Sequence, residues 1–339
     1  WLRIYINVME RAAFAALFPS AFSRRAKAAA KAFGKPQRIL VGLQGIMSAC
    51  ADAYFADLPE KIIKRFTFRD WLKRDNIQEQ QEKFALRAEH ETQLLRLADH
   101  VTGRTAFDQK AALRVHPSMQ YHFMNETMRS NFYDGETWKE ENCKPHQIFV
   151  SQGNYPLKGL HKVIEALPLI REMYPDVTVH VAGDVITAHH TWKEKIKLSS
   201  YGKYLLELMK KYQCTGQVSF LGKLDADQMK QEFLHAHVFV CASSMENSSN
   251  SIGEAMLLGV PVVSSRVGGL ESLLTDEKEG LFYEFSDEKE LARRVMRVFE
   301  DADLENELSR NARARALETH DPQKNFARLM EIYQEILHP

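Results

Sequence analysis

The chain has 339 residues, and its 45 Lys and Arg residues balance its 45 Asp and Glu residues. With 45% hydrophobic and 27% charged residues, it has the composition of a globular protein of about two domains, which excludes a disordered tail, a collagen-like chain and a disulfide-stapled miniprotein. The balanced charge argues against a nucleic-acid-binding protein, and four cysteines without a CxxC pair give no zinc or redox signature.

The charge is unevenly distributed along the chain. Residues 1–145 contain 23 basic and 17 acidic side chains, a balance of +6, so residues 146–339 carry −6. Residues 1–38 contain eight basic side chains and a single acidic one, Glu10, with phenylalanine and leucine between them. This pattern is typical either of a basic amphipathic helix on an anionic membrane or of an ordinary packed helix with a solvated basic face.

The first half of the chain predicts few regular elements. Residues 8–33 have helical spacing interrupted at Pro19, and no strand with a glycine-rich loop is predicted before Arg38. We therefore expect the chain to start inside its first domain, about one βαβ unit after that domain's beginning. The polar run 134–146 is the expected linker. The other predicted elements are a strand over 38–45, a helix over 76–97, and strands over 100–103 and 120–124.

The second half alternates short apolar runs with helical patterns. Such alternation predicts βαβ units and a parallel sheet, and continuously apolar strands predict helices on both of its faces. Residues 286–337 are helical in pattern, and Pro322 after Asp321 marks the start of a last helix. The expected strands cover 147–151, 177–183, 218–222, 238–242, 261–265 and 281–283, and the expected helices 158–173, 201–212, 225–235 and 249–258.

Three segments that could carry chemistry follow successive predicted strands, at the edge where such sheets bind ligands. In the first, the glycine-containing loop that begins at Gly153 places Lys158 at the start of a helix. Backbone N–H groups and an ammonium suit a phosphate or diphosphate, although the same loop also reads as a surface turn with a solvated lysine.

The second segment contains Glu246 and Glu254, separated by small polar residues that lead into a helix. Carboxylates at a helix start disfavour a phosphate unless they bind sugar or ribose hydroxyls; the plain alternative is a capped helix with exposed acids. The third segment, Gly268-Gly269, allows a ligand to approach the backbone closely or simply forms a tight turn.

The order of these segments resembles family 4 of the GT-B glycosyltransferases, the group 1 enzymes, which use nucleotide sugars and retain anomeric configuration. The run ENSSNSIGEAMLLGVPVVSSRVGG is similar to the family's E-x7-E motif and following strand, and VSQGNYPLKGLHKVIEALPLI to its strand, phosphate loop and helix. The resemblance is strong over about residues 147–300. It continues weakly through RILVGLQG and HVTGRTAFD, which look like the acceptor domain of bacterial enzymes that build surface polysaccharides.

The resemblance implies an α/β fold of two Rossmann-like, doubly wound domains that face a cleft. We expect an incomplete acceptor-side domain over 1–140, a nucleotide-sugar-binding domain over 141–320, and a helix over 321–339 that crosses back to the first domain.

The resemblance also implies roles for individual residues. Lys158 should neutralise the diphosphate of the donor, Glu246 should face the donor sugar, and Glu254 should bind the ribose hydroxyls. Lys158 and Glu246 are therefore the expected catalytic residues. The remaining donor-binding residues are expected to be Gly153, Gly222, Ser248, Ser249, Asn250 and Ser251, and the acceptor-side residues Gln44, Gly45 and Arg104.

Three positions depart from the family pattern. Gly153 stands where the family usually has an arginine, so a second cation for the diphosphate must come from elsewhere. Gln44 precedes Gly45 where the family often has histidine, and an amide cannot become charged. Leu270 follows the glycine pair, without the family's usual Ile-Pro-Glu sequence.

Two patterns that suggest a metal are better explained without one. Asp225-Ala226-Asp227 spells the Asp-x-Asp of metal-dependent glycosyltransferases, but Gln228 completes a helix capping box with Asp225. His189-His190 are adjacent, so their side chains point apart. We expect no metal and no cofactor apart from the nucleotide sugar.

We therefore expect a glycosyltransferase that moves a sugar from a UDP- or GDP-linked donor to a glycan or polyprenyl-linked acceptor in surface-polysaccharide biosynthesis. We expect it in the cytoplasm, with contact to the inner face of the plasma membrane through residues 1–38, and without nucleic acid as a partner. Two alternatives are a donor-binding scaffold subunit that no longer catalyses and a nucleotide-sugar epimerase. An epimerase needs a strong acid/base set that the sequence does not show.

Overall fold

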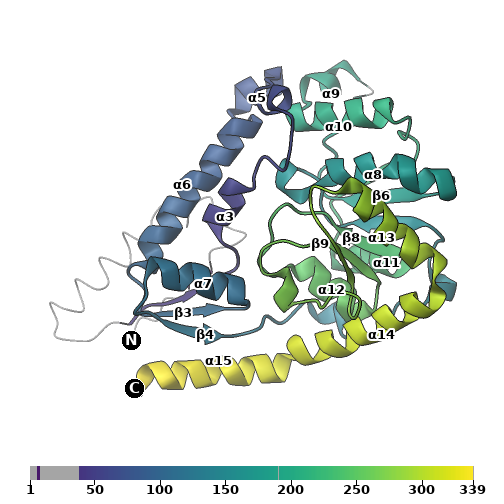
Figure 1. Ribbon diagram of the computed structural model, residues 1–339. Helices are drawn as coiled ribbons and strands as arrows, with labels where there is room; N and C mark the ends of the chain where they lie inside the picture. Colours follow the sequence, from purple (N-terminus) through teal and green to yellow (C-terminus); the bar gives the residue numbers. More distant parts are fainter. Residues whose placement is uncertain (1–5, 8–37, 190, 339) are drawn as a thin grey trace.

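The computed structural model describes residues 6–7, 38–189 and 191–338, and these form two parallel β-sheets with helices around them (Figure 1). The predicted helical pattern over 8–33 and nearly all of the basic segment 1–38 lie outside the described residues. None of the described helices has both the length and the apolar composition that a membrane span requires.

The first sheet has four parallel strands in the order β1-β2-β3-β4. Ile6–Asn7 pairs with Val41–Gly42, so the prediction that no strand precedes Arg38 is wrong. A two-residue strand is too short for hydrophobic periodicity to reveal it. The strands are β1 (Ile6–Asn7), β2 (Leu40–Gly42), β3 (His100–Gly103) and β4 (Gln120–Phe123).

The second sheet has six parallel strands in the order β10-β9-β8-β5-β6-β7. The strand order therefore reverses between β5 and β8, and a doubly wound sheet binds its ligand at the carboxyl ends of the strands beside such a reversal. The strands are β5 (Gln147–Val150), β6 (Thr178–Ala182), β7 (Val218–Gly222), β8 (Val238–Cys241), β9 (Val262–Ser265) and β10 (Leu281–Tyr283).

The helices connect successive strands and cover the sheets. All four side chains of β5, β8 and β9 are buried, as expected for strands covered on both faces. The helices of the first half are α3 (Met47–Asp52), α4 (Glu60–Ile63), α5 (Phe68–Lys73), α6 (Ile77–Leu95) and α7 (Ala106–Val115). Those of the second half are α8 (Leu160–Met173), α9 (Trp192–Ile196), α10 (Ser200–Lys211), α11 (Ala226–His235), α12 (Asn250–Leu258), α13 (Glu288–Glu300), α14 (Ala302–Thr319) and α15 (Pro322–Leu337).

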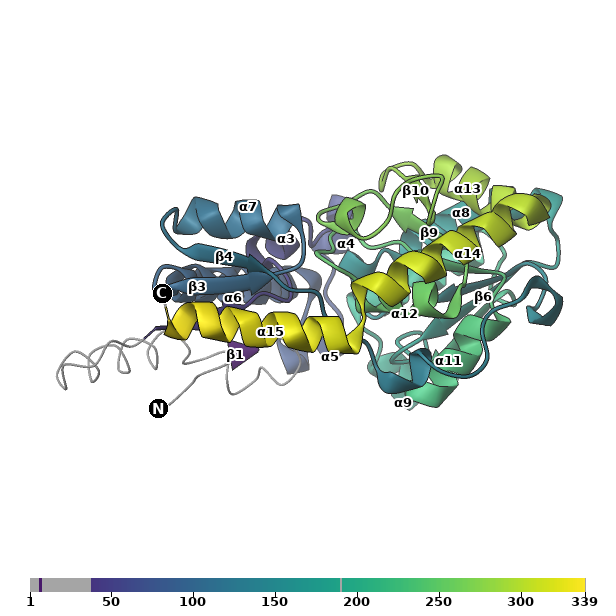
Figure 2. The ribbon, with the colours of Figure 1, turned by 90° about the horizontal axis from the view of Figure 1, so that it is seen from below.

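Two segments join the halves of the molecule. The chain from Tyr54 to Ile77 leaves the first sheet and packs into the same hydrophobic cluster as α8 and α10. At the other end of the chain, α15 returns to the first sheet and lies beside β4 (Figure 2). There the Arg328 side chain donates to the Phe123 carbonyl at 3.4 Å, and Glu335 lies 3.2 Å from His122.

Candidate functional site

The loop after β5 holds Lys158 against the loop after β8. The 3₁₀ turn Pro156–Lys158 ends at Gly159, which has a φ of +65° and lies so close to the Ala242 carbonyl that a Cβ would sit 1.7 Å from its oxygen. Only glycine fits there. The turn directs Lys158 so that its Nζ donates to Glu246 Oε1 at 2.5 Å. Burial lowers the pKa of Lys158, but the charge and hydrogen bond of Glu246, together with the nearby Tyr155 and Cys241, outweigh burial and leave the pKa above its usual value.

Gly153 lies in the packing of this loop. It is buried, and a Cβ at this position would come 2.5 Å from a methyl group of Leu160 and 3.0 Å from Val181. The position therefore has no room for the arginine of the family pattern unless Leu160 and Val181 move. A second positive charge has to enter from another element.

The start of α12 lies beside this pair. Glu246 also accepts from the Ser243 hydroxyl at 2.8 Å, and its carbonyl accepts from the Gly269 N–H at 3.0 Å. Ser249 occupies the N-cap position of α12, but its side chain makes no capping hydrogen bond. The hydroxyls of Ser249 and Ser251 are 3.4 Å apart. Because the side chain does not cap them, the first N–H groups of α12 are suited to an anion.

Glu254 lies one turn further along α12 and is held by an arginine that the sequence analysis missed. Arg129, just after the first sheet, donates from Nε and Nη2 to the two Glu254 oxygens at 2.6 and 2.8 Å. The Glu254 side chain is buried, and a two-point arginine contact fixes the orientation of its carboxylate. No sequence motif marks Arg129, because its role depends on the position of α12.

Arg104 reaches the start of α12 from the first domain. Its guanidinium donates to Asn250 Oδ1 at 3.0 Å and to Gln44 Oε1 at 2.7 Å, and it lies 2.6 Å from Glu126. Its side chain is only 6% exposed, and Nε has no hydrogen-bond partner among the described residues. Gln44 cannot be charged, but it accepts a hydrogen bond from Arg104, which always carries a positive charge. Gly45 follows in the turn that leads to α3.

A second contact between the domains holds the loop that precedes α12. Asn247 is buried; its Oδ1 accepts from Thr105 Oγ1 at 2.6 Å, and its Nδ2 donates to Asp108 at 2.8 Å. Thr105 and Asp108 form the capping box of α7. Gly269 approaches Thr105 so closely that a Cβ would lie 2.8 Å from it. The spacing Thr105-x-x-Asp108 could have been recognised as a helix cap, but not its contact with Asn247.

The predicted residues thus fall into two sets. The structure brings Lys158, Glu246 and the segment Ser248–Ser251 together at the carboxyl edge of β5 and β8, and adds Arg104 and Gln44 from the first domain. Gly222 lies apart from them, at the end of the edge strand β7, which β6 and β5 separate from β8.

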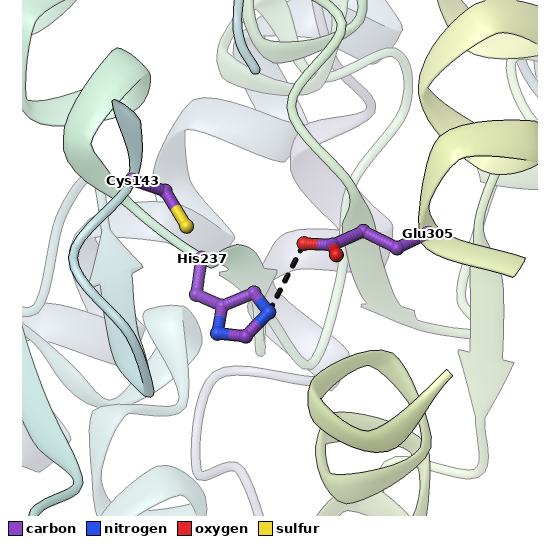
Figure 3. Close-up of side chains that lie close together, drawn as sticks. All are labelled: Cys143, His237 and Glu305. Atoms are coloured by element: carbon purple, nitrogen blue, oxygen red, sulfur yellow. Dashed lines mark ion pairs between the residues drawn. The ribbon is translucent and has the colours of Figure 1, made fainter. Parts of the chain in front are cut away.

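Cys143, His237 and Glu305 form the one cluster of potential metal ligands among the described residues, with ligand atoms within 4.8 Å of one another (Figure 3). His237 Nε2 lies 3.0 Å from Glu305, and the His146 N–H donates to Nδ1 at 3.0 Å. Since Nδ1 accepts this hydrogen bond, the neutral ring carries its proton on Nε2, and that nitrogen has no lone pair for a metal. Burial also raises the pKa of the Cys143 thiol to about 12.

The Asp225-x-Asp227 pattern is also structural. Asp225 caps α11 by accepting from the Asp227 and Gln228 N–H groups at 3.0 and 2.8 Å, as the sequence predicts. We therefore assign neither this Asp-x-Asp pattern nor the cluster of Cys143, His237 and Glu305 to a metal.

Comparison with known proteins gives this geometry a context. The family model described as glycosyl transferases group 1 matches residues 136–315. The protein YtcC of Bacillus subtilis is 28% identical over 186 residues, which cover 54% of this chain and 44% of YtcC. The chain spans less than half the length of this and two other curated relatives that it matches.

Two solved structures resemble the whole described chain. Sucrose-phosphate synthase from Thermosynechococcus elongatus superposes with a TM-score of 0.70 at 17% identity, over 97% of this chain and 80% of that protein. HepE from Anabaena, in complex with UDP-glucose, superposes with a TM-score of 0.66 at 18% identity, over 93% of this chain and 77% of HepE. At these identities the matches establish the fold, and they confirm the predicted GT-B class.

Proposed function

Because the chain belongs to the glycosyl transferases group 1 family, we propose that it transfers a sugar from a nucleotide diphosphate sugar to a hydroxyl of a glycan or lipid-linked glycan. We further propose that the transfer retains anomeric configuration, needs no metal and serves surface-polysaccharide synthesis in the cytoplasm, at the inner face of the membrane. UDP is the first donor nucleotide to test, since HepE was solved with UDP-glucose.

One observation carries the proposal: two basic side chains contact the segment 246–250, which leads into an uncapped helix start at the carboxyl edge of the second sheet. Lys158 comes from the β5 loop, Arg104 from the first domain, and the N–H groups from the start of α12. A departing diphosphate gains negative charge as the glycosidic bond breaks. Fixed positive groups aimed at that charge stabilise the transition state more than the ground state.

The reaction that fits this arrangement is a front-face substitution. The bond between the anomeric carbon and the diphosphate oxygen breaks, and the bond to the acceptor oxygen forms on the same face. The acceptor proton passes to the departing β-phosphate oxygen. In the proposed reaction Glu246, which accepts a hydrogen bond from Lys158, contacts the sugar, and Glu254 accepts from the ribose hydroxyls once Arg129 shares or yields its contact.

The first test is a panel of nucleotide sugars with mass detection of products, together with calorimetric titration of UDP and GDP. Lys158→Ala is expected to lower kcat about 10²–10³-fold, and Glu254→Ala to raise the KM for the donor. Near-wild-type kinetics for both variants would contradict the assignment. Nucleotide binding without turnover would indicate a scaffold subunit that no longer catalyses. Inversion of the sugar at C2 would indicate a nucleotide-sugar epimerase.

A further inference from the structure

The short helix α5 buries a charged side chain and exposes its large apolar ones, the reverse of an ordinary surface helix. Its carboxylate Asp70 is fully buried and accepts from the Ser200 N–H at 2.9 Å, while its large apolar side chains point to solvent. Phe68, Trp71 and Leu72 are 60%, 63% and 67% exposed. Phe66, just before the helix, is also exposed. The burial of Asp70 is explained by these contacts, since it also pairs with Arg69 at 3.0 Å; the exposure of the large apolar side chains is not explained by packing.

A second apolar segment lies next to it. Thr67, the N-cap of α5, donates to the Leu198 carbonyl at 2.8 Å, which places the end of α9 beside the start of α5 (Figure 1). On α9, Trp192 and Ile196 are four residues apart, on one helix face, and both are exposed. We call these two segments, residues 66–74 and 192–198, the α5–α9 surface.

The charge of this surface is basic. Its exposed ionic side chains belong to Lys73, Arg74, Lys193, Lys195 and Lys197. The acids within the two segments are already engaged inside the protein: Asp70 is buried, and Glu194 accepts from the Thr191 N–H in a capping box. Exposed tryptophan and phenylalanine surrounded by lysine are therefore the chemistry that this surface offers.

We propose that the α5–α9 surface docks on an anionic lipid bilayer. Tryptophan and phenylalanine side chains favour the interface between headgroups and acyl chains, and each nearby lysine adds attraction to anionic lipids. A protein partner fits less well, because lysine is depleted from protein–protein interfaces. The proposal concerns residues other than 1–38, and it does not require the protein to be a glycosyltransferase.

The position of the surface gives such docking a use. α9 follows β6, so the chain enters this surface from the carboxyl edge of the second sheet, the edge that also carries Lys158 and Glu246. A bilayer bound there would lie on the side of the donor loops, from which a lipid-linked acceptor could approach them.

The experiment is co-sedimentation of the full chain with phosphatidylcholine vesicles, with and without about a third phosphatidylglycerol. The wild type is expected to bind the anionic vesicles and to dissociate as salt rises. Phe68→Ser with Trp71→Ser should weaken binding at least about tenfold, because two apolar anchors are lost. Lys195→Glu with Lys197→Glu should weaken it at least about 25-fold, at roughly fivefold per charge.

Phe326→Ser is the matched control, since Phe326 is 64% exposed but lies on α15. It is expected to bind as the wild type does. All exchanged side chains are exposed, so the melting temperature should stay unchanged and a folding defect can be recognised. Absence of binding to anionic vesicles overturns the proposal. So does unchanged binding of the Phe68/Trp71 variant, which would assign membrane contact to another part of the chain.

Discussion

At the residue scale, we propose that Arg104 supplies the positive charge that position 153 lacks. We expect Arg104→Ala to weaken binding of UDP, or of GDP if that is the donor nucleotide, about 10–100-fold. The nucleoside alone should bind unchanged, because it lacks the diphosphate. Calorimetric titration of both ligands separates a contact with the diphosphate from a general loss of domain contact, which would weaken both equally.

Two further variants sharpen this prediction. Glu126 lies 2.6 Å from the Arg104 guanidinium and partly neutralises it, so Glu126→Gln is expected to tighten nucleotide diphosphate binding a few-fold. Arg65 also reaches from the first half of the chain to the second, where it pairs with Glu207 on α10 at 2.8 Å. Arg65→Ala should leave nucleotide binding unchanged.

The sequence located Lys158, Glu246 and the start of α12 because each lies just after a strand in a recognisable pattern. It did not predict Arg129 or Asn247 as contact residues, and it assigned Arg104 to the acceptor side only. The roles of these three arise from contacts between residues 125–146 positions apart in the chain. Such contacts depend on how the two domains meet, and periodicity carries no information about that.

At the element scale, Glu91 on α6 connects the protein's stability to pH. It is buried and accepts from the Met47 N–H at the start of α3, and burial raises the pKa of its carboxyl to about 7. Between about pH 4.5 and 7 the folded chain therefore holds a proton that the unfolded chain does not. The stability contributed by this group is present at low pH and is lost as pH rises.

Glu91→Gln keeps the hydrogen bond from Met47 but cannot ionise. At pH 8 the variant should be more stable than the wild type by up to about 3 kcal/mol, and the difference should vanish near pH 4.5. Urea unfolding at several pH values measures this. The exposed neighbour Glu89→Gln is the control, and a stability difference for Glu91→Gln that does not change with pH would contradict the assignment.

The long elements were predictable because they repeat a pattern. Asn76 caps α6 and Asp321 caps α15, as their positions suggest, and all six strands of the second sheet appear within a residue or two of the expected ranges. The helices α3, α4, α5, α7 and α9 were missed. All but α7 have four to six residues, too few for a helical period to stand out, and α5 also turns its apolar side chains outward; α7 has ten residues and was missed although it is longer.

At the scale of the whole molecule, α15, the last helix of the chain, packs beside the first sheet. Ile332 is the buried residue of α15 and lies on the same helix face as Arg328 and Glu335, which contact β4. We expect Ile332→Ala to lower the free energy of unfolding by about 2–4 kcal/mol, because it leaves a cavity at this contact.

Calorimetry checks this prediction, and the loss should appear in the transition of the first domain. Met330→Ala, at a 41% exposed position of the same helix, should change the stability by no more than about 0.5 kcal/mol. Equal losses for the two variants would show that α15 contributes through its helix content and not through docking.

Because α15 packs beside the first sheet, it also limits where this chain can be joined to a related one in a chimaeric protein. A chimaera that exchanges the second sheet has to keep α15 together with the first sheet. The C-terminal junction of the exchanged segment therefore belongs between α14 and α15. There His320 is buried, and its Nδ1 lies 2.7 Å from the Glu126 carbonyl. The second sheet with its helices is thus an insert within the first domain, and its boundaries are two points in the chain instead of one.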